Sequence, residues 1–107
     1  MTVSQKVSEY IEFIPPADVI ENHDGIKILL DVPGACTEGL SINIESGELK
    51  VSADTCINRC EKIVRYKRNF QVSDQINVEN VKAKLADGVL ELTLPKHEHA
   101  QVHKIEI

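Results

Sequence analysis

Tryptophan is absent from the sequence, and aromatic residues make up only 4% of it. A core built from this chain must therefore be aliphatic, and its isoleucine, valine and leucine residues favour strands over helices. No apolar stretch approaches the roughly 20 residues that a membrane-spanning helix needs. The N-terminus also lacks a basic start followed by an apolar run, so we expect no signal peptide.

Positive charge is in short supply as well: 12 Lys and Arg stand against 17 Asp and Glu, for a net charge of −5. A nucleic-acid-binding domain usually presents a basic face, so we expect neither nucleic acid nor an anionic membrane as a partner. Three cysteines are an odd number, which fits a disulfide framework poorly. We therefore predict that Cys36, Cys56 and Cys60 are free thiols in the reducing cytoplasm, with reversible oxidation of Cys56 and Cys60 as the alternative.

Motifs for catalysis are missing too. The sequence contains no nucleophile elbow, phosphate-binding glycine loop or metalloprotease helix, so we predict no enzyme and no cofactor. Three of the four histidines, His97, His99 and His103, lie near the C-terminus. His97 and His99 would share one face of an extended segment, but no cysteine or carboxylate cluster completes a metal site there. We interpret this stretch as a polar, pH-sensitive linker without metal.

Short alternating apolar segments dominate the rest of the chain. Hairpin turn signals at Asp24-Gly25, Ser46-Gly47 and Asp87-Gly88 separate several of them. This pattern predicts an all-β, Ig-like antiparallel sandwich of about seven to eight strands. The expected strands are Ala17–Asn22, Gly25–Val32, Leu40–Glu45, Leu49–Ala53, Ile63–Val72, Val81–Leu85 and Leu90–Leu94, with a loop or helical turn over Ala35–Gly39.

The predicted sandwich spans residues 17–95, between an N-terminal arm of residues 1–16 and a C-terminal extension of residues 96–107. Apolar residues of the arm recur at helical spacing up to Pro15-Pro16, which predicts a short amphipathic helix or a frayed terminus. The extension ends on Ile105-Glu106-Ile107. Its two isoleucines lie on one side of a short strand, which suits either a groove at the edge of a sheet or pairing with the chain's own sandwich.

Arg68 breaks the alternation of its strand. The even positions from Val64 to Val72 are otherwise apolar, so Arg68 falls on the apolar face. A buried guanidinium must be paired, because an unpaired one costs several kcal/mol. Either that face meets a partner that carries a carboxylate, or Arg68 reaches solvent at an edge.

Four motifs resemble the α-crystallin domain of small heat-shock proteins. Ala83–Leu90 resembles the A-x-x-x-(N/D)-G-V-L signature of that family, carried here by Ala83, Gly88, Val89 and Leu90. Tyr66–Val72 is similar to its F-x-R-x-F-x-L strand, and Ile105-Glu106-Ile107 matches its I-x-I tail. Its LPG…I-x-V…G-x-L-x-I-x core is matched by Asp31–Gly34, Leu40–Ile44, Gly47 and Leu49–Ser52.

The resemblance implies an ATP-independent holdase chaperone of the stress response that binds non-native client proteins and forms homo-oligomers. It implies that Arg68 and Tyr66 lie at a dimer interface. It also implies that Ile105 and Ile107 anchor the tail of one copy in a groove of another, formed by Leu40, Ile42, Ile44, Val81, Ala83 and Leu85. A co-chaperone or adaptor of the CS-domain type is the alternative, although such domains usually carry tryptophan and lack the I-x-I motif.

Two departures from the family pattern bear on assembly. The connection from Asp54 to Arg65 is shorter than in typical bacterial and plant members, which carry an exchanged strand there. The resemblance therefore leaves two dimers open, one with an exchanged loop and one in which the Tyr66 strand pairs with its own copy. The short arm implies a smaller oligomer and narrower holdase activity.

Overall fold

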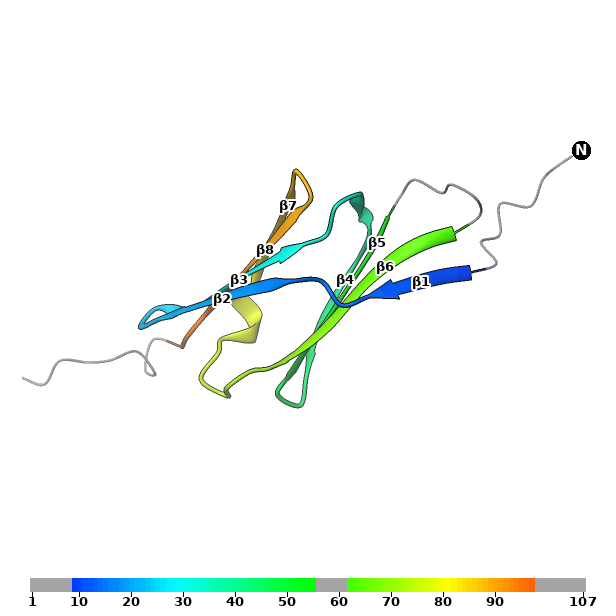
Figure 1. Ribbon diagram of the computed structural model, residues 1–107. Coiled ribbons are helices and arrows are strands. Elements are labelled where there is room, and N and C mark those ends of the chain that lie inside the picture. The colour runs from blue at the N-terminus through cyan, green and yellow to red at the C-terminus, as the bar shows by residue number, and fades with distance from the viewer. Residues whose placement is uncertain (1–8, 56–61, 98–107) are drawn as a thin grey trace, which may run out of the picture.

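Two four-stranded sheets face each other in the computed structural model, which describes residues 9–55 and 62–97 (Figure 1). The first sheet has the order β1 (Glu9–Phe13), β6 (Lys62–Gln71), β5 (Glu48–Thr55) and β4 (Ala35–Glu45). The second has the order β2 (Ala17–Asn22), β3 (Gly25–Asp31), β8 (Val89–Pro95) and β7 (Lys82–Ala86). A 3₁₀ turn, η1 (Val78–Asn80), precedes β7. The predicted sandwich is confirmed, and the described residues include no helix long and apolar enough to cross a membrane.

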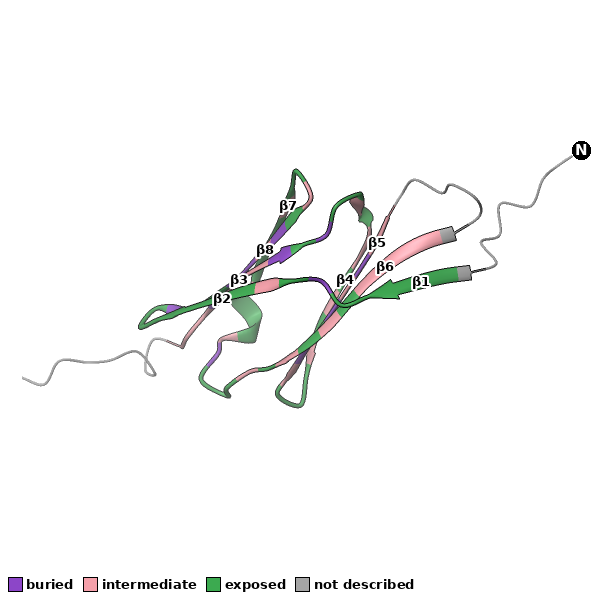
Figure 2. Cartoon of the chain, in the orientation of Figure 1, coloured by how far each residue is buried: buried purple, intermediate pink, exposed green. Residues whose placement is uncertain are grey.

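The core lies between β3 and β8 of the second sheet and β5 of the first. Alternate residues of these strands point inward, as their sequence pattern predicts. In Figure 2 the buried segments gather on these three strands. The buried residues, each at most 2% exposed, include Ile28, Leu30, Leu49, Val51, Ala53, Leu90, Leu92 and Leu94.

Two of the three predicted hairpin turns adopt the type I′ geometry that their residues favour. Asp87 and Gly88 have φ values of 52° and 77°, and the pair Ser46 and Gly47 has 52° and 79°. Positive φ at both central residues is the mark of the type I′ turn, whose twist matches that of the flanking strands. Gly88 is further constrained, because an added Cβ would lie 3.2 Å from the Cα atom of Pro33.

The N-terminal arm is not helical where the structure describes it. Residues 9–13 form β1, which pairs in parallel with β6 and aligns Glu12 with Arg65, so the prediction of a helix is wrong for these residues. An isolated helix of this length is marginal in water. Pro15 and Pro16 also push the residues before them towards extended conformations, and the edge of β6 provides backbone partners. Residues 1–8 lie outside the described part of the chain.

The start of β4 differs from the prediction in two ways. Ala35–Gly39 belongs to the strand rather than to a loop or helical turn, with a register shift between Ala35 and Leu40. Cys36 is disulfide-bonded, so the prediction of a free thiol is wrong for this residue. The pairing of Ala35 with Thr55 lays the start of β4 beside the end of β5, a proximity that a count of cysteines does not reveal. Cys56 and Cys60 lie outside the described residues.

Candidate docking groove and strand edges

An apolar groove of about 350 Å³ lies between the two sheets at the β4 side of the sandwich. Ile42 and Ile44 of β4 form one wall. Val78 of η1, Val81 and Ala83 of β7 form the other. Among the described strands β4 pairs only with β5, and β7 only with β8, so each wall ends in an edge strand with unpaired backbone groups. Such an edge can accept an extended peptide, with apolar pockets for its alternate side chains.

Four of the six predicted groove residues line this groove: Ile42, Ile44, Val81 and Ala83. The other two, Leu40 and Leu85, are partly buried against the core and do not line it. Val78 was not predicted, because the stretch from Ser73 to Glu79 has the composition of a polar loop. The available signal was Asn77, whose Oδ1 atom accepts a hydrogen bond from the Glu79 amide at 3.2 Å and begins η1.

The lining of the groove contains no charged or nucleophilic side chain. Within residues 9–55 and 62–97, no group of three or more His, Cys, Asp or Glu side chains is placed to hold a metal ion. A groove with this lining can bind apolar side chains by burying them. His97 lies at the end of the described chain, and His99 and His103 lie outside it.

The opposite side of the sandwich is organised around Arg65, which the sequence reasoning missed. Its Nε atom donates to Oδ1 of Asp54 at 2.8 Å, and its second guanidinium nitrogen donates to Oδ2 at 3.0 Å. The hydrogen bond to Asp54 raises the pKa of Arg65 above its already high usual value. The guanidinium also lies over the ring of Tyr10, 3.9 Å from its centroid. A two-pronged carboxylate bond and a cation–π contact thus join β5, β6 and β1 at one side chain.

Arg68 and Tyr66 both lie on the inner face of β6, where each finds a backbone carbonyl. Arg68 donates to the carbonyl oxygen of Pro15 at 2.9 Å, and its guanidinium carbon lies 5.3 Å from the centroid of the Phe70 ring. The Tyr66 hydroxyl donates to the carbonyl oxygen of Pro33 at 2.8 Å, and burial raises the pKa of Tyr66. Within one chain, a carbonyl and an aromatic ring therefore take the place of the carboxylate expected for Arg68.

Exposed apolar side chains are concentrated on the N-terminal segment. Six of the eight large hydrophobic residues that are exposed in the described chain lie between Tyr10 and Ile20. This segment comprises β1, the linker Ile14–Pro16 and β2, and it runs along one side of the sandwich as a nearly continuous exposed path in Figure 2. An apolar surface of this kind marks a site of interaction more often than a solvated face.

The residues of the A-x-x-x-(N/D)-G-V-L signature lie at different positions in the fold. Ala83 lines the groove, Gly88 forms the turn and accepts a hydrogen bond from the Val32 amide at 2.7 Å, and Leu90 is fully buried. Val89 is exposed. The tail anchors Ile105 and Ile107 lie outside the described residues.

The first two residues of the C-terminal extension are held against the sandwich. The amide of Lys96 donates to the carbonyl oxygen of Asp24 at 3.0 Å, and that of His97 to the carbonyl oxygen of Gln75 at 2.9 Å. Lys96 also forms an isolated bridge with Ile76, a core residue. The path of the extension is therefore set as far as His97.

Comparison with known proteins gives a consistent result. The model of the Hsp20/alpha crystallin family matches residues 18–107. The chain is 33% identical to the 17.7 kDa class II heat shock protein of Arabidopsis thaliana over 93 residues, which cover 76% of this chain and 60% of that protein. It is 26% identical to the probable 15 kDa heat shock protein of Leptospira interrogans over 116 aligned positions, which cover 100% of this chain and 88% of that protein.

Solved structures share the fold. Heat shock protein 16.0 from Schizosaccharomyces pombe superposes with a TM-score of 0.72 at 24% identity, over 90% of this chain and 98% of that one. The hspA protein from Xanthomonas axonopodis gives a TM-score of 0.65 at 21% identity, over 78% of this chain and 94% of that one.

Proposed function

The chain belongs to the Hsp20/alpha crystallin family, and from this premise we propose that it is an ATP-independent holdase that binds unfolding polypeptides and suppresses their aggregation. We expect it to act in the cytoplasm as a homo-oligomer, with no enzymatic activity, cofactor, nucleic acid or membrane involved. The observation that carries the proposal is the row of exposed apolar side chains from Tyr10 to Ile20. An unfolding chain exposes apolar segments, and contact with this row removes both surfaces from water.

Light scattering of a heat-labile client without ATP tests the proposal. We expect equimolar amounts of the protein to suppress most of the scattering. Replacing the exposed Val19 and Ile20 of β2 together by serine should weaken suppression, because it removes apolar surface from the row. Lys50→Ser, on an exposed polar position of β5, is the matched control and should keep full activity. Scattering that is unchanged by the native protein at equimolar ratio would refute the holdase proposal.

We further propose that the groove between β4 and β7 binds Ile105 and Ile107 of a second copy. The support is chemical: the groove is apolar, and two edge strands flank it. Burial of two isoleucine side chains contributes about 3–6 kcal/mol before the cost of ordering the tail. A contact of this strength holds subunits together but releases them at elevated temperature.

Native mass spectrometry of the variant with Ile105→Ala and Ile107→Ala tests the tail contact. We expect the oligomer to shrink, whereas Glu106→Ala should leave its mass unchanged, because the middle residue of an extended three-residue segment would face away from the side shared by the two isoleucines. The variant Val78→Asp attacks the same contact from the groove and should reproduce the loss. An unchanged particle in both variants would mean that the tail does not connect subunits.

A second contact between copies is proposed on the β6 side, at Arg68 and Tyr66. Both side chains lie under the β1 edge, where Tyr66 faces Phe13 at a ring-centroid distance of 6.4 Å. Arg68→Ala should therefore weaken the dimer, as measured by native mass spectrometry over a dilution series. A dimer of unchanged affinity would reject this interface.

A further inference from the structure

Charge is divided unevenly between β1 and β6. β6 carries four cations, Lys62, Arg65, Lys67 and Arg68, and no carboxylate. β1 carries two carboxylates, Glu9 and Glu12, and no cation. The parallel register aligns Glu12 with Arg65, and the charge of Glu12 contributes to the raised pKa of Arg65. The edge of β6 is therefore matched to an acidic, alternating strand.

The same charges disfavour the pairing of β6 with a second β6. Such a pair would bring four cations from each strand together without a carboxylate on either. Like charges on directly opposite residues destabilise a strand pair. A strand of β1 character on this edge avoids that repulsion, because its carboxylates lie beside the cations of β6.

Within the described residues, the one strand that β1 pairs with is β6. None of its described residues belongs to the core or packs against it, and Tyr10, Ile11 and Phe13 are 48%, 38% and 52% exposed. Its contacts are the ladder with β6, the cation–π contact of Tyr10 and the ring contact of Phe13. Removing β1 from its own sandwich would leave the core intact.

In the linker between β1 and β2, hydrogen bonds hold the two prolines that follow Ile14. Pro15 is fully buried and its carbonyl oxygen is bound by Arg68, while the carbonyl oxygen of Pro16 accepts from the Asp31 amide at 3.1 Å. Ile14 is 79% exposed. Because Ile14 and Pro15 each precede a proline, both favour extended conformations, and no tight turn separates β1 from β2 in Figure 1. Rotation about Ile14 is thus sufficient to redirect β1.

We infer that two copies of the chain associate by exchanging β1, so that the β1 strand of each lies on the basic edge of β6 of the other. This inference rests on the self-association in the proposed function and names the contact that produces it. Exchange of an identical element reproduces every contact of the closed chain between two chains. Tyr66 and Arg68 would then lie at the interface, beside Phe13 and Ile14 of the partner subunit.

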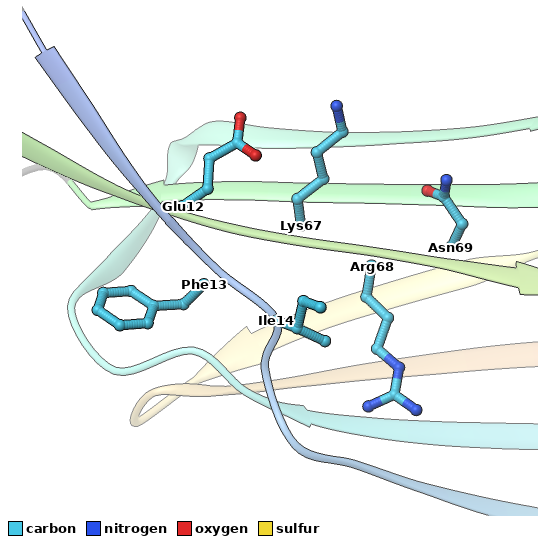
Figure 3. A pocket seen from close by; sticks show the side chains of 6 residues that line it. All are labelled: Glu12, Phe13, Ile14, Lys67, Arg68 and Asn69. Atoms are coloured by element: carbon cyan, nitrogen blue, oxygen red, sulfur yellow. The ribbon is translucent and has the colours of Figure 1, made fainter.

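The space beside Ile14 is large enough for the linker of a second copy to pass. A cavity of about 670 Å³ is lined by Glu12, Phe13, Ile14, Lys67, Arg68 and Asn69. In Figure 3, Glu12, Lys67 and Asn69 point to one side of the β6 ribbon, while Arg68 points to the other, next to Ile14. Beyond β1, the edge of β6 from Lys67 onward has no strand partner among the described residues. A partner's linker can therefore approach β6 at this point.

Charge complementation distinguishes exchange from a closed chain. E12K places two cations at the contact between β1 and β6, and R65E adds a carboxylate beside those of Glu12 and Asp54, so each variant alone should dimerise about tenfold more weakly than the native chain. In a mixture, exchange lets the introduced lysine of one variant meet the introduced glutamate of the other. The remaining native pair of Glu12 and Arg65 forms on the opposite side of the dimer.

We expect native mass spectrometry of an equimolar mixture, with one variant labelled with ¹⁵N, to show about tenfold more heterodimer than a statistical distribution. The chain that carries both E12K and R65E is the control, since it also lacks the bond to Asp54 but restores the charge match. Its homodimer should match the heterodimer in affinity. A statistical distribution in the mixture would overturn the exchange.

A second experiment needs no variant and so does not depend on whether R65E folds. Labelled and unlabelled native chains are equilibrated and treated with a zero-length carboxyl–amine crosslinker. Exchange predicts crosslinked peptides that join Glu12 of one isotope to Lys67 of the other; same-isotope pairs alone would refute it. Mixed pairs from a protein that fails the light-scattering assay would reject the holdase and keep the exchange, and the reverse result would reject only the exchange.

Discussion

The pairing of β3 with β8 and the pairing of β1 with β6 are both strand contacts rich in apolar residues, yet they have opposite consequences. β3 and β8 pair over seven residues in the middle of a sheet, where Leu30 lies opposite Leu90 and both are fully buried. β1 and β6 pair over five residues at an edge, where the apolar side chains of β1 stay exposed. Strand pairing alone therefore does not bury a side chain; a second sheet above it does.

The difference separates stability from association. Free energy of folding comes mainly from apolar area removed from water, and the central strands hold most of it. The edge pair contributes backbone hydrogen bonds and contacts around Arg65, which a second chain can supply equally well. We expect substitutions in the central pair to change unfolding and those in the edge pair to change assembly.

Truncation in each region gives the largest contrast. Leu92→Ala, at a fully buried position of β8, should lower the free energy of unfolding by about 3–5 kcal/mol because it removes buried methyl groups and leaves a cavity. Ile11→Ala on β1 should lower it by less than about 1 kcal/mol, since that side chain is exposed. Urea unfolding measures both. Equal losses would show that β1 contributes to the core.

Removing the disulfide at Cys36 shows whether the start of β4 contributes to the stability of the fold, as β3 and β8 do, or contributes little to it, as β1 does. Cys36→Ser should lower the free energy of unfolding by about 2–4 kcal/mol, because the crosslink restricts the unfolded chain. Reduction of the native protein should have the same effect and leave the serine variant unchanged. A native protein insensitive to reductant would place this end of β4 outside the stable region.

Tyr66 lies between the core and the β1–β6 edge, and we expect its substitution to have the smallest effect on the free energy of unfolding. Burial raises its pKa, so the folded chain keeps the phenol protonated at pH values where the unfolded chain, with a pKa of about 10, ionises. The unfolded state then binds fewer protons, and stability falls as pH rises above that value.

Tyr66→Phe should remove this alkaline loss, and at neutral pH it should cost less than about 1 kcal/mol for the hydrogen bond to Pro33. Urea unfolding at neutral and alkaline pH measures both effects. An unchanged slope in Tyr66→Phe would assign the loss to other groups.

Strands flanked by strong turn signals were predictable from the sequence. Asp24-Gly25 and Asp87-Gly88 mark hairpins in which β3 and β8 alternate regularly, so the spacing of apolar residues and the turn residues predict the same strands. The alternation also predicted the two strands that carry four of the groove residues, whereas the groove itself was implied only by the family resemblance. All residues that make up such a signal lie within about ten positions of one another in the sequence.

Features that depend on distant parts of the chain were not predictable in this way. β1 is a strand because the edge of β6, some 50 residues later in the sequence, provides backbone groups for it to pair with. The spacing of the apolar residues in β1 fits a helix equally well. The disulfide of Cys36 and the role of Arg65 likewise depend on how β4, β5 and β6 align. Val78 joins the groove only because η1 turns it towards β4.

The anchoring of Lys96 and His97 has a consequence for the geometry of assembly. Because their backbone amides are bound at Asp24 and Gln75, the C-terminal extension leaves every subunit from the same point. The ten residues that follow can span at most about 35 Å. In the proposed assembly this makes the extension a short tether, with a high effective concentration of its isoleucines near any groove within that radius and almost none beyond it. The length of the extension would therefore limit the assembly to those arrangements of neighbouring subunits in which a groove lies within its reach.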